Sequence, residues 1–193
     1  CAIRDGYTPS FLHMNYGQLT EKRELISFNN ISEFYSINEN LIFDISHLNL
    51  IGGSCLTDKS ITTPVANLKS KTIPISYVPF RNANILSAAV SWCETINSEA
   101  IYIGAVEEDS SGYPDCRRSF FNSFEEVIKH GTKPETRIQI ITPLINLTKK
   151  EIIKLGVALN APLHLTWNCY QNNDKPCMVC DSCALRKRGF DKA

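Results

Sequence analysis

The sequence predicts an α/β fold with a doubly wound parallel sheet, and two observations support this prediction. Strand-like and helix-like segments alternate along the chain, an order typical of βαβ units whose strands run parallel. Hydrophobic residues make up 43% of the 193 residues, which is enough to bury the core of one domain of ordinary size. The expected strands are residues 10–16, 41–45, 101–105 and 137–141.

Helices are expected where apolar residues recur at helical spacing or where a capping signal stands. In residues 20–37, Leu25 and Phe28 belong to one apolar face. A further helix begins at Thr148, because Thr148 and Glu151 have the spacing of a capping box. The remaining expected helices are residues 82–96 and 119–129.

Residues 49–76 interrupt the alternation. Gly52-Gly53, Pro64 and Pro74 punctuate a stretch without periodicity, which predicts a long irregular excursion. A loop of that length inside a compact domain usually has a function.

The charge balance argues against two classes of partner. The chain has 20 basic and 20 acidic residues and a pI near 7.0. A strongly basic nucleic-acid binder and a protein held electrostatically on an anionic membrane would both show an excess of cations. No apolar run approaches the roughly 18 residues of a membrane-spanning helix. We therefore expect a soluble, cytoplasmic protein with no membrane and no stable nucleic-acid partner.

The cysteines cluster near the C-terminus in a metal-ligand pattern. Of eight cysteines, four lie within fifteen residues: Cys169, Cys177, Cys180 and Cys183. Two overlapping C-x-x-C steps and one upstream cysteine suit a tetrahedral zinc site, and four protein ligands leave no position open for catalysis. A redox dithiol pair and an iron–sulfur cluster are the alternatives. We expect an α/β domain over residues 1–160 and a zinc-binding segment over residues 161–193.

Ligands of parallel sheets bind beyond the carboxyl ends of the strands. This rule selects the turn after Tyr16, the loop after Ala105 and the segment after Ile141. The loop over residues 107–118 mixes carboxylates, hydroxyls, glycine and arginine, which suits a polar heterocycle or a phosphate. Arg81 stands at the expected start of a helix, which predicts an anion site. A solvated loop and an ordinary surface arginine explain the same spacing equally well.

Four sequence blocks occur in one order: GGSCLTD at 52–58, YVPFRN at 77–82, GAVEEDSSGYPDCR at 104–117 and WNCYQNNDKPCMVCDSC at 167–183. In these blocks the chain resembles the 7-cyano-7-deazaguanine synthase family of the PP-loop ATPase superfamily, whose fold is Rossmann-like. The resemblance runs from about Gly6 to Phe190. It implies conversion of 7-carboxy-7-deazaguanine, ammonia and ATP into 7-cyano-7-deazaguanine, a queuosine precursor, through an adenylated carboxylate and an amide.

The resemblance also implies roles for individual residues. Asp115 and Arg81 are the expected catalytic residues, and the four clustered cysteines are the expected ligands of a structural Zn²⁺. The expected substrate-binding residues are Ser111, Gly112, Tyr113, Asp115 and Arg117. The expected nucleotide-binding residues, which would contact ATP with its Mg²⁺, are Asn15, Tyr16, Gly17, Arg81 and Gly104. The resemblance further implies a homodimer.

One departure from the family pattern is large. The family has an S-G-G-x-D-S phosphate loop after its first strand, and no such loop stands in these 193 residues. The Gly52-Gly53-Ser54 triplet matches a different block. We therefore expect an N-terminally truncated synthase that lacks its first strand and phosphate loop. Such a piece alone is expected to be inactive and poorly stable.

Two other functions compete with this interpretation. Another PP-loop enzyme, such as one that thiolates tRNA, would need a cysteine pair near the nucleotide, and Cys116 has no obvious partner outside the C-terminal cluster. A non-catalytic zinc-knuckle module that binds RNA would need basic residues interleaved with aromatic ones, and the neutral charge argues against it.

Overall fold

The strands of the computed structural model run parallel to one another in two pairs. The structure describes residues 1–70, 72–107 and 112–193. Strand β1 (Phe11–Asn15) pairs with β2 (Asn40–Asp44), and β3 (Ala100–Tyr102) pairs with β4 (Gln139–Ile141). The mixed α/β architecture with parallel strands is confirmed. Within the described ranges the two pairs are separate two-stranded sheets, and β3 and β4 have only three residues each.

The chain divides into two compact units. Unit 1 comprises Cys1–Pro79 and Thr148–Ala193, and unit 2 comprises Phe80–Leu147. The domain boundary expected between residues 160 and 161 falls inside unit 1 and stays a prediction.

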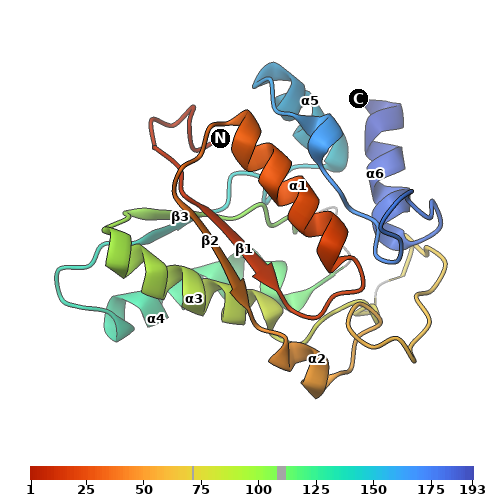
Figure 1. Ribbon diagram of the computed structural model, residues 1–193, viewed down its shortest axis with the longest axis horizontal. Helices are drawn as coiled ribbons and strands as arrows, with labels where there is room; N and C mark the ends of the chain where they lie inside the picture. Colours follow the sequence, from red (N-terminus) through yellow and green to blue (C-terminus); the bar gives the residue numbers. More distant parts are fainter. Residues whose placement is uncertain (71, 108–111) are drawn as a thin grey trace. The chain divides into compact units, whose positions relative to one another are not determined.

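Unit 1 begins with a βαβ arrangement. Helix α1 (Glu21–Phe34) lies beside the β1–β2 pair (Figure 1). The ring of Phe28 packs 6.3 Å from that of Phe11 and 5.1 Å from that of His13, centroid to centroid, so the apolar face of α1 covers β1. The helix was expected to reach residue 37, but it ends at Phe34 and Ser36 then adopts a left-handed backbone.

The excursion after β2 is irregular but firmly anchored. It opens with the short helix α2 (His47–Ile51), which the sequence analysis did not anticipate. The Cys55 N–H donates to the Ile75 carbonyl at 3.0 Å, and the Leu19 N–H donates to the Leu56 carbonyl at 2.9 Å. Residues 54–57 are all buried. The excursion is therefore part of the packed interior of unit 1.

Two helices close unit 1. Helix α5 (Lys149–Ala158) packs on α6 (Asp181–Lys192), and a single turn, η2 (Leu163–Leu165), lies between them in the chain (Figure 1). A Cβ on Gly189 would stand 2.9 Å from Ile153 Cδ1 and 2.9 Å from Lys149 Cβ. The two helices approach this closely because residue 189 has no side chain.

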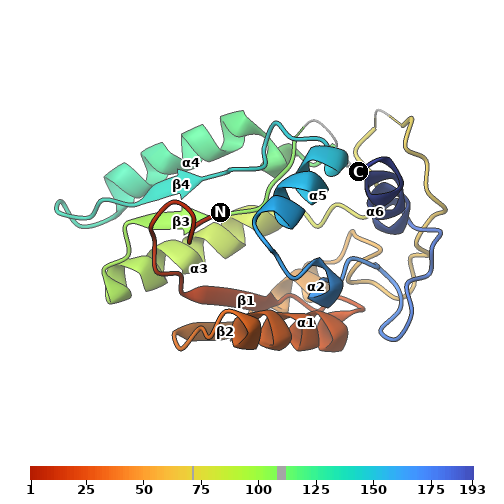
Figure 2. The ribbon, with the colours of Figure 1, turned by 90° about the horizontal axis from the view of Figure 1, so that it is seen from above.

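Unit 2 places helices on both faces of its strand pair. Helix α3 (Arg81–Ile96) and helix α4 (Arg118–Gly131) lie on opposite sides of β3 and β4 (Figure 2). The single turn η1 (Pro114–Cys116) precedes α4. Leu86 is fully buried and Phe121 is 1% exposed, and both belong to the hydrophobic core together with Ile140. Strands covered on both faces are typical of α/β proteins.

The C-terminal part of α3 is tied to the segment before β4. The Glu94 carboxylate accepts the Lys133 N–H at 3.0 Å and the Thr136 hydroxyl at 2.6 Å. The Thr136 hydroxyl and the Lys133 N–H lower the pKa of Glu94 from its usual value.

Among the described residues, no helix has the length and the apolar composition needed to cross a membrane.

The capping box predicted at the start of α5 is confirmed. The Thr148 hydroxyl oxygen accepts the Glu151 N–H at 3.3 Å, and the Glu151 carboxylate accepts the Thr148 N–H at 2.8 Å. Thr148→Ala is expected to lower the free energy of unfolding by about 1 kcal/mol, because a helix N–H loses its partner. Urea denaturation measures this loss. Thr62→Ala, at an exposed position outside any helix, is the control, and an equal loss in both variants would contradict the capping role.

Glu94→Gln is expected to destabilise unit 2 at neutral pH and to have little effect in acid. The folded state lowers the pKa of Glu94, so the carboxylate stabilises the fold above its unfolded pKa. This contribution disappears as the pH falls through the lowered folded value. The measurement is the urea midpoint of both proteins as a function of pH. Exposed Glu135→Gln is the control, and a difference between Glu94→Gln and the unaltered protein that does not change with pH would refute the mechanism.

Candidate functional site

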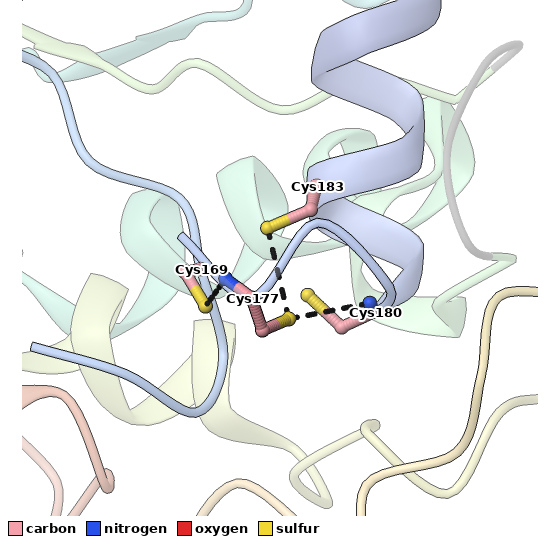
Figure 3. Close-up of side chains that lie close together, drawn as sticks. All are labelled: Cys169, Cys177, Cys180 and Cys183. Atoms are coloured by element: carbon pink, nitrogen blue, oxygen red, sulfur yellow. Dashed lines mark hydrogen bonds between the residues drawn. The ribbon is translucent and has the colours of Figure 1, made fainter. Parts of the chain in front are cut away.

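Four thiols of unit 1 converge on one point. The sulfur atoms of Cys169, Cys177, Cys180 and Cys183 all lie within 4.8 Å of one another, and the side chains point toward a common centre (Figure 3). Tetrahedral zinc with Zn–S bonds of about 2.3 Å separates its sulfurs by about 3.8 Å. The Cys177 and Cys183 sulfurs are 3.9 Å apart. The cluster is compatible with a structural metal.

The local backbone explains why these thiols meet. Cys169 follows η2, Cys180 is the N-cap of α6, and Cys183 lies in the first turn of that helix. Met178 adopts a left-handed backbone at φ 62°, which turns the chain between Cys177 and Cys180. The Cys177 N–H donates to the Cys169 sulfur at 3.3 Å, and the Cys180 N–H donates to the Cys177 sulfur at 3.4 Å. The knuckle, residues 177–183, thus places backbone N–H groups within hydrogen-bond distance of the cysteine sulfurs.

The thiols differ in how readily they lose a proton. Burial raises the pKa of Cys180 and of Cys183. Burial also acts to raise the pKa of Cys177, but hydrogen bonds outweigh it and lower the pKa to about 7. Those bonds come from the backbone of Val179 and Cys180 and from neighbouring thiols. Cys177 is therefore the most readily ionised of these three ligands.

The cysteine segment also holds two distant parts of unit 1. The Asn173 amide accepts the Arg23 N–H and donates to the Leu19 carbonyl, both at 3.3 Å. The Arg23 guanidinium lies 4.6 Å from the ring centroid of Trp167. These contacts fasten Trp167 and the arm between Cys169 and Cys177 to the start of α1.

The knuckle itself is joined to the excursion. The Ala66 N–H donates to the Val179 carbonyl at 2.8 Å, and the Asn67 N–H donates to the Asp181 carboxylate at 3.0 Å. Segments more than 100 positions apart in the sequence thus meet at the four cysteines.

The three predicted nucleotide-binding residues of unit 1 lie together at the carboxyl end of β1. The Asn15 carbonyl accepts the Ile45 N–H at 2.7 Å, and the buried Tyr16 donates its N–H to the Gln18 side chain at 2.8 Å. Gly17 has a left-handed backbone at φ 78°, and a Cβ there would stand 2.6 Å from Asn49 Cβ. Only glycine fits this turn.

The predicted residues of unit 2 gather around the start of α3 and the turn before α4. Asp115 is buried, and its carboxylate oxygen Oδ2 accepts the Asn82 N–H at 2.9 Å. The Asn82 side-chain amide donates to the Asp115 carbonyl at 2.9 Å and to the Cys116 sulfur at 3.3 Å. Arg81 is the first residue of α3. The structure therefore brings Arg81 and Asp115 into one neighbourhood.

The remaining predicted residues of unit 2 flank this pair. Tyr113 is the N-cap of η1, and the exposed Arg117 is the N-cap of α4. Gly112 is exposed with a left-handed backbone, and Gly104 follows β3. Ser111 lies outside the described residues.

Sequence reasoning missed three polar residues whose hydrogen bonds hold segments of unit 1 or unit 2 together: Glu107, Asn82 and Asn173. Glu107 accepts the Arg118 N–H at 2.8 Å, and the Arg118 side chain donates to the Thr142 hydroxyl. Asn82 and Asn173 bridge segments 33 and 150 positions away. Asn82 was regarded only as part of a motif, because nothing in its local spacing identifies a partner so far along the chain.

Comparison with known proteins places the chain in a family. The sequence model of the family described as "Queuosine biosynthesis protein QueC" matches residues 1–193. The chain is 57% identical over 188 residues to a protein of Chloroherpeton thalassium named 7-cyano-7-deazaguanine synthase, covering 97% of this chain and 83% of that protein. A protein of the same name from Chlorobium chlorochromatii is 56% identical over 192 residues, covering 100% and 84%.

A third organism has a similar protein. The 7-cyano-7-deazaguanine synthase of Chlorobaculum parvum is 55% identical over 189 residues, which cover 98% of this chain and 83% of that protein. The three matches cover 97–100% of this chain. The chain belongs to the QueC family of queuosine biosynthesis proteins.

Proposed function

We propose that the protein converts 7-carboxy-7-deazaguanine and ammonia into 7-cyano-7-deazaguanine at the expense of ATP, as a carbon–nitrogen ligase of queuosine biosynthesis. The observation that carries this proposal is the 55–57% identity, over nearly the whole chain, to proteins named for that activity. The four ordered sequence blocks support it as well.

The chemistry requires two activations. A carboxylate is a poor electrophile, so its oxygen first attacks the α-phosphorus of ATP, and pyrophosphate leaves. Ammonia adds to the acyl-adenylate, AMP leaves, and an amide results. The amide oxygen is adenylated in the same way by a second ATP. Loss of AMP and of the nitrogen-bound protons then leaves the nitrile. Mg²⁺ bound to ATP would neutralise charge on the phosphates in both activations.

The proposal assigns the predicted residues to two tasks. Arg81 stabilises the negative charge that develops on the transferred phosphate. Asp115 binds the ring N–H groups of the deazapurine, with Ser111, Gly112, Tyr113 and Arg117 lining the same loop. The adenine side takes Asn15, Tyr16, Gly17 and Gly104. The position of Asn15, Tyr16 and Gly17 at the carboxyl end of β1 supports this division, since ligands of parallel sheets bind at such ends.

The four cysteines are proposed to hold Zn²⁺ as a structural ion. All four sulfurs lie within 4.8 Å of one another, and four protein ligands leave no position for a substrate. The cysteines would thereby hold the arm against α1 and the knuckle against the excursion. A reducing compartment, the proposed cytoplasm, keeps such thiols free of disulfides. Ammonia as nitrogen donor and a second copy as dimer partner complete the proposal, supported by the family resemblance.

Arg81→Ala is expected to lower kcat about a hundredfold, because loss of one group that stabilises transition-state charge typically has that effect. The assay follows 7-cyano-7-deazaguanine and AMP formation by the protein expressed from its complete coding sequence. Arg137→Ala is the matched control, since Arg137 bonds the Pro134 and Thr136 carbonyls away from the predicted site. Absence of ATP-dependent nitrile formation by the unaltered protein refutes the proposed function. Equal rates for both variants refute the role of Arg81 alone.

Cys180→Ser is expected to remove most of the bound zinc and to lower Tm by several degrees, because one ligand of a closed site is lost. Metal analysis of the purified protein, expected at about one zinc per chain, and a thermal scan with and without chelator measure both effects. Cys93→Ala is the control, since Cys93 is also buried but lies in α3. It is expected to retain the metal. A full zinc content in Cys180→Ser would contradict the assignment.

A further inference from the structure

Asn82 donates three hydrogen bonds to the turn that contains Asp115. Its backbone N–H donates to Asp115 Oδ2, and its side-chain amide donates to the Asp115 carbonyl, both at 2.9 Å. The third contact runs from the same amide to the Cys116 sulfur at 3.3 Å. Both residues are nearly inaccessible, with exposed fractions of 6% for Asn82 and 4% for Asp115. The Asn82 side chain therefore fixes the backbone position of Asp115.

Only one of the two Asp115 carboxylate oxygens takes part in these contacts with Asn82. Oδ2 faces the first turn of α3, where the helix dipole and the Asn82 N–H both favour a negative charge. Within the part of the chain that the structure describes, Oδ1 makes no hydrogen bond to the protein. Oδ1 is not among the fully buried side-chain atoms that lack a partner, so it can be reached by an incoming group. A carboxylate oxygen is an acceptor, which suits an N–H group from outside the chain.

We infer that Asn82 is the positioning residue for deazapurine recognition. It holds Asp115 so that Oδ1 accepts ring or amino N–H groups of the guanine-like substrate. This inference rests on the proposed function, because it takes the deazapurine as the ligand. Asn82 touches neither substrate nor nucleotide and acts through Asp115.

A guanine-like ring suits this arrangement. It carries two adjacent donors on one edge, the ring N–H and the exocyclic amino group, and a carboxylate is the acceptor that best matches such donors. A carboxylate oriented by the Asn82 N–H, on a backbone held by the Asn82 side chain, loses little conformational entropy when the ligand arrives. A freely rotating Asp115 side chain would bind the same donors more weakly.

The inference distinguishes two ways in which Asn82 could matter. If Asn82 served only the stability of unit 2, its replacement would lower the fraction of active enzyme and leave each KM unchanged. If Asn82 positions Asp115, the affinity for the deazapurine falls while that for ATP is retained. A double-mutant cycle with Asp115 then shows strong coupling, because Asn82→Ala releases the Asp115 backbone and so disturbs the placement of the carboxylate that Asp115→Asn alters.

The experiment measures binding and kinetics on the complete protein. Calorimetric titration with 7-carboxy-7-deazaguanine in the absence of ATP yields the dissociation constant, and steady-state rates yield KM for each substrate. The variants are Asn82→Ala, Asp115→Asn and the two combined. Asn122→Ala, an exposed asparagine on α4 of the same unit, is the control. Asn82→Ser, which keeps a short polar side chain, serves if Asn82→Ala does not fold.

Asn82→Ala is expected to weaken deazapurine binding about tenfold and Asp115→Asn about thirtyfold, the range for a hydrogen bond to a charged group. KM for ATP should stay within about twofold, and the double variant should resemble Asp115→Asn alone. Asn82→Ser should lose about threefold.

Equal losses for both substrates, strictly additive effects, or unchanged deazapurine binding would each overturn the inference while the proposed function stands. Failure of the unaltered protein to bind the deazapurine would overturn both. Binding without turnover would refute only the proposed reaction, since the variants can still be ranked by their dissociation constants.

Discussion

The convergence of four thiols constrains unit 1 more than any other interaction. Three segments far apart in the sequence, the start of α1, the excursion after β2 and the cysteine segment, are hydrogen-bonded to one another around this cluster. Thiolates packed within 4.8 Å of one another repel unless a cation compensates them. Asn173, Val179 and Asp181, which lie between or next to the four cysteines, make these contacts, so an ion held by the cysteines would also order the loops that these residues bind.

Local patterns predicted the elements well and their pairing less well. The helix starts near Glu21, Arg81, Arg118 and Lys149 are each within a residue of the expected positions, since apolar spacing and caps act over a few residues. The strands were expected to form one sheet, yet the described strands form two separate pairs. Hydrogen bonds between strands depend on residues distant in the chain, and neither Ala100–Tyr102 nor Gln139–Ile141 offers more than three positions for pairing.

The same distinction governs the site. The cysteine cluster was predictable because its ligands are close in sequence and have a spacing that few other structures need. The hydrogen-bond partners of Asn82 and Glu107 were not predictable, because they lie 33 and 11 positions away and such a bond produces no periodic pattern in the sequence. The resemblance identified the blocks that contain these residues. It did not show that Asn82 of one block is hydrogen-bonded to Asp115 of another.

The two helix starts in unit 2 change the expectation for anion binding. The Asn82 N–H at the start of α3 already donates to Asp115, and the Arg118 N–H at the start of α4 already donates to Glu107. Both positive helix ends are thus compensated by carboxylates from the intervening loop. A phosphate near α3 would therefore depend on the guanidinium of Arg81 rather than on these backbone donors. A carboxylate accepts N–H groups and a guanidinium binds anions, so a donor-rich heterocycle would suit Asp115 and an anion would suit Arg81.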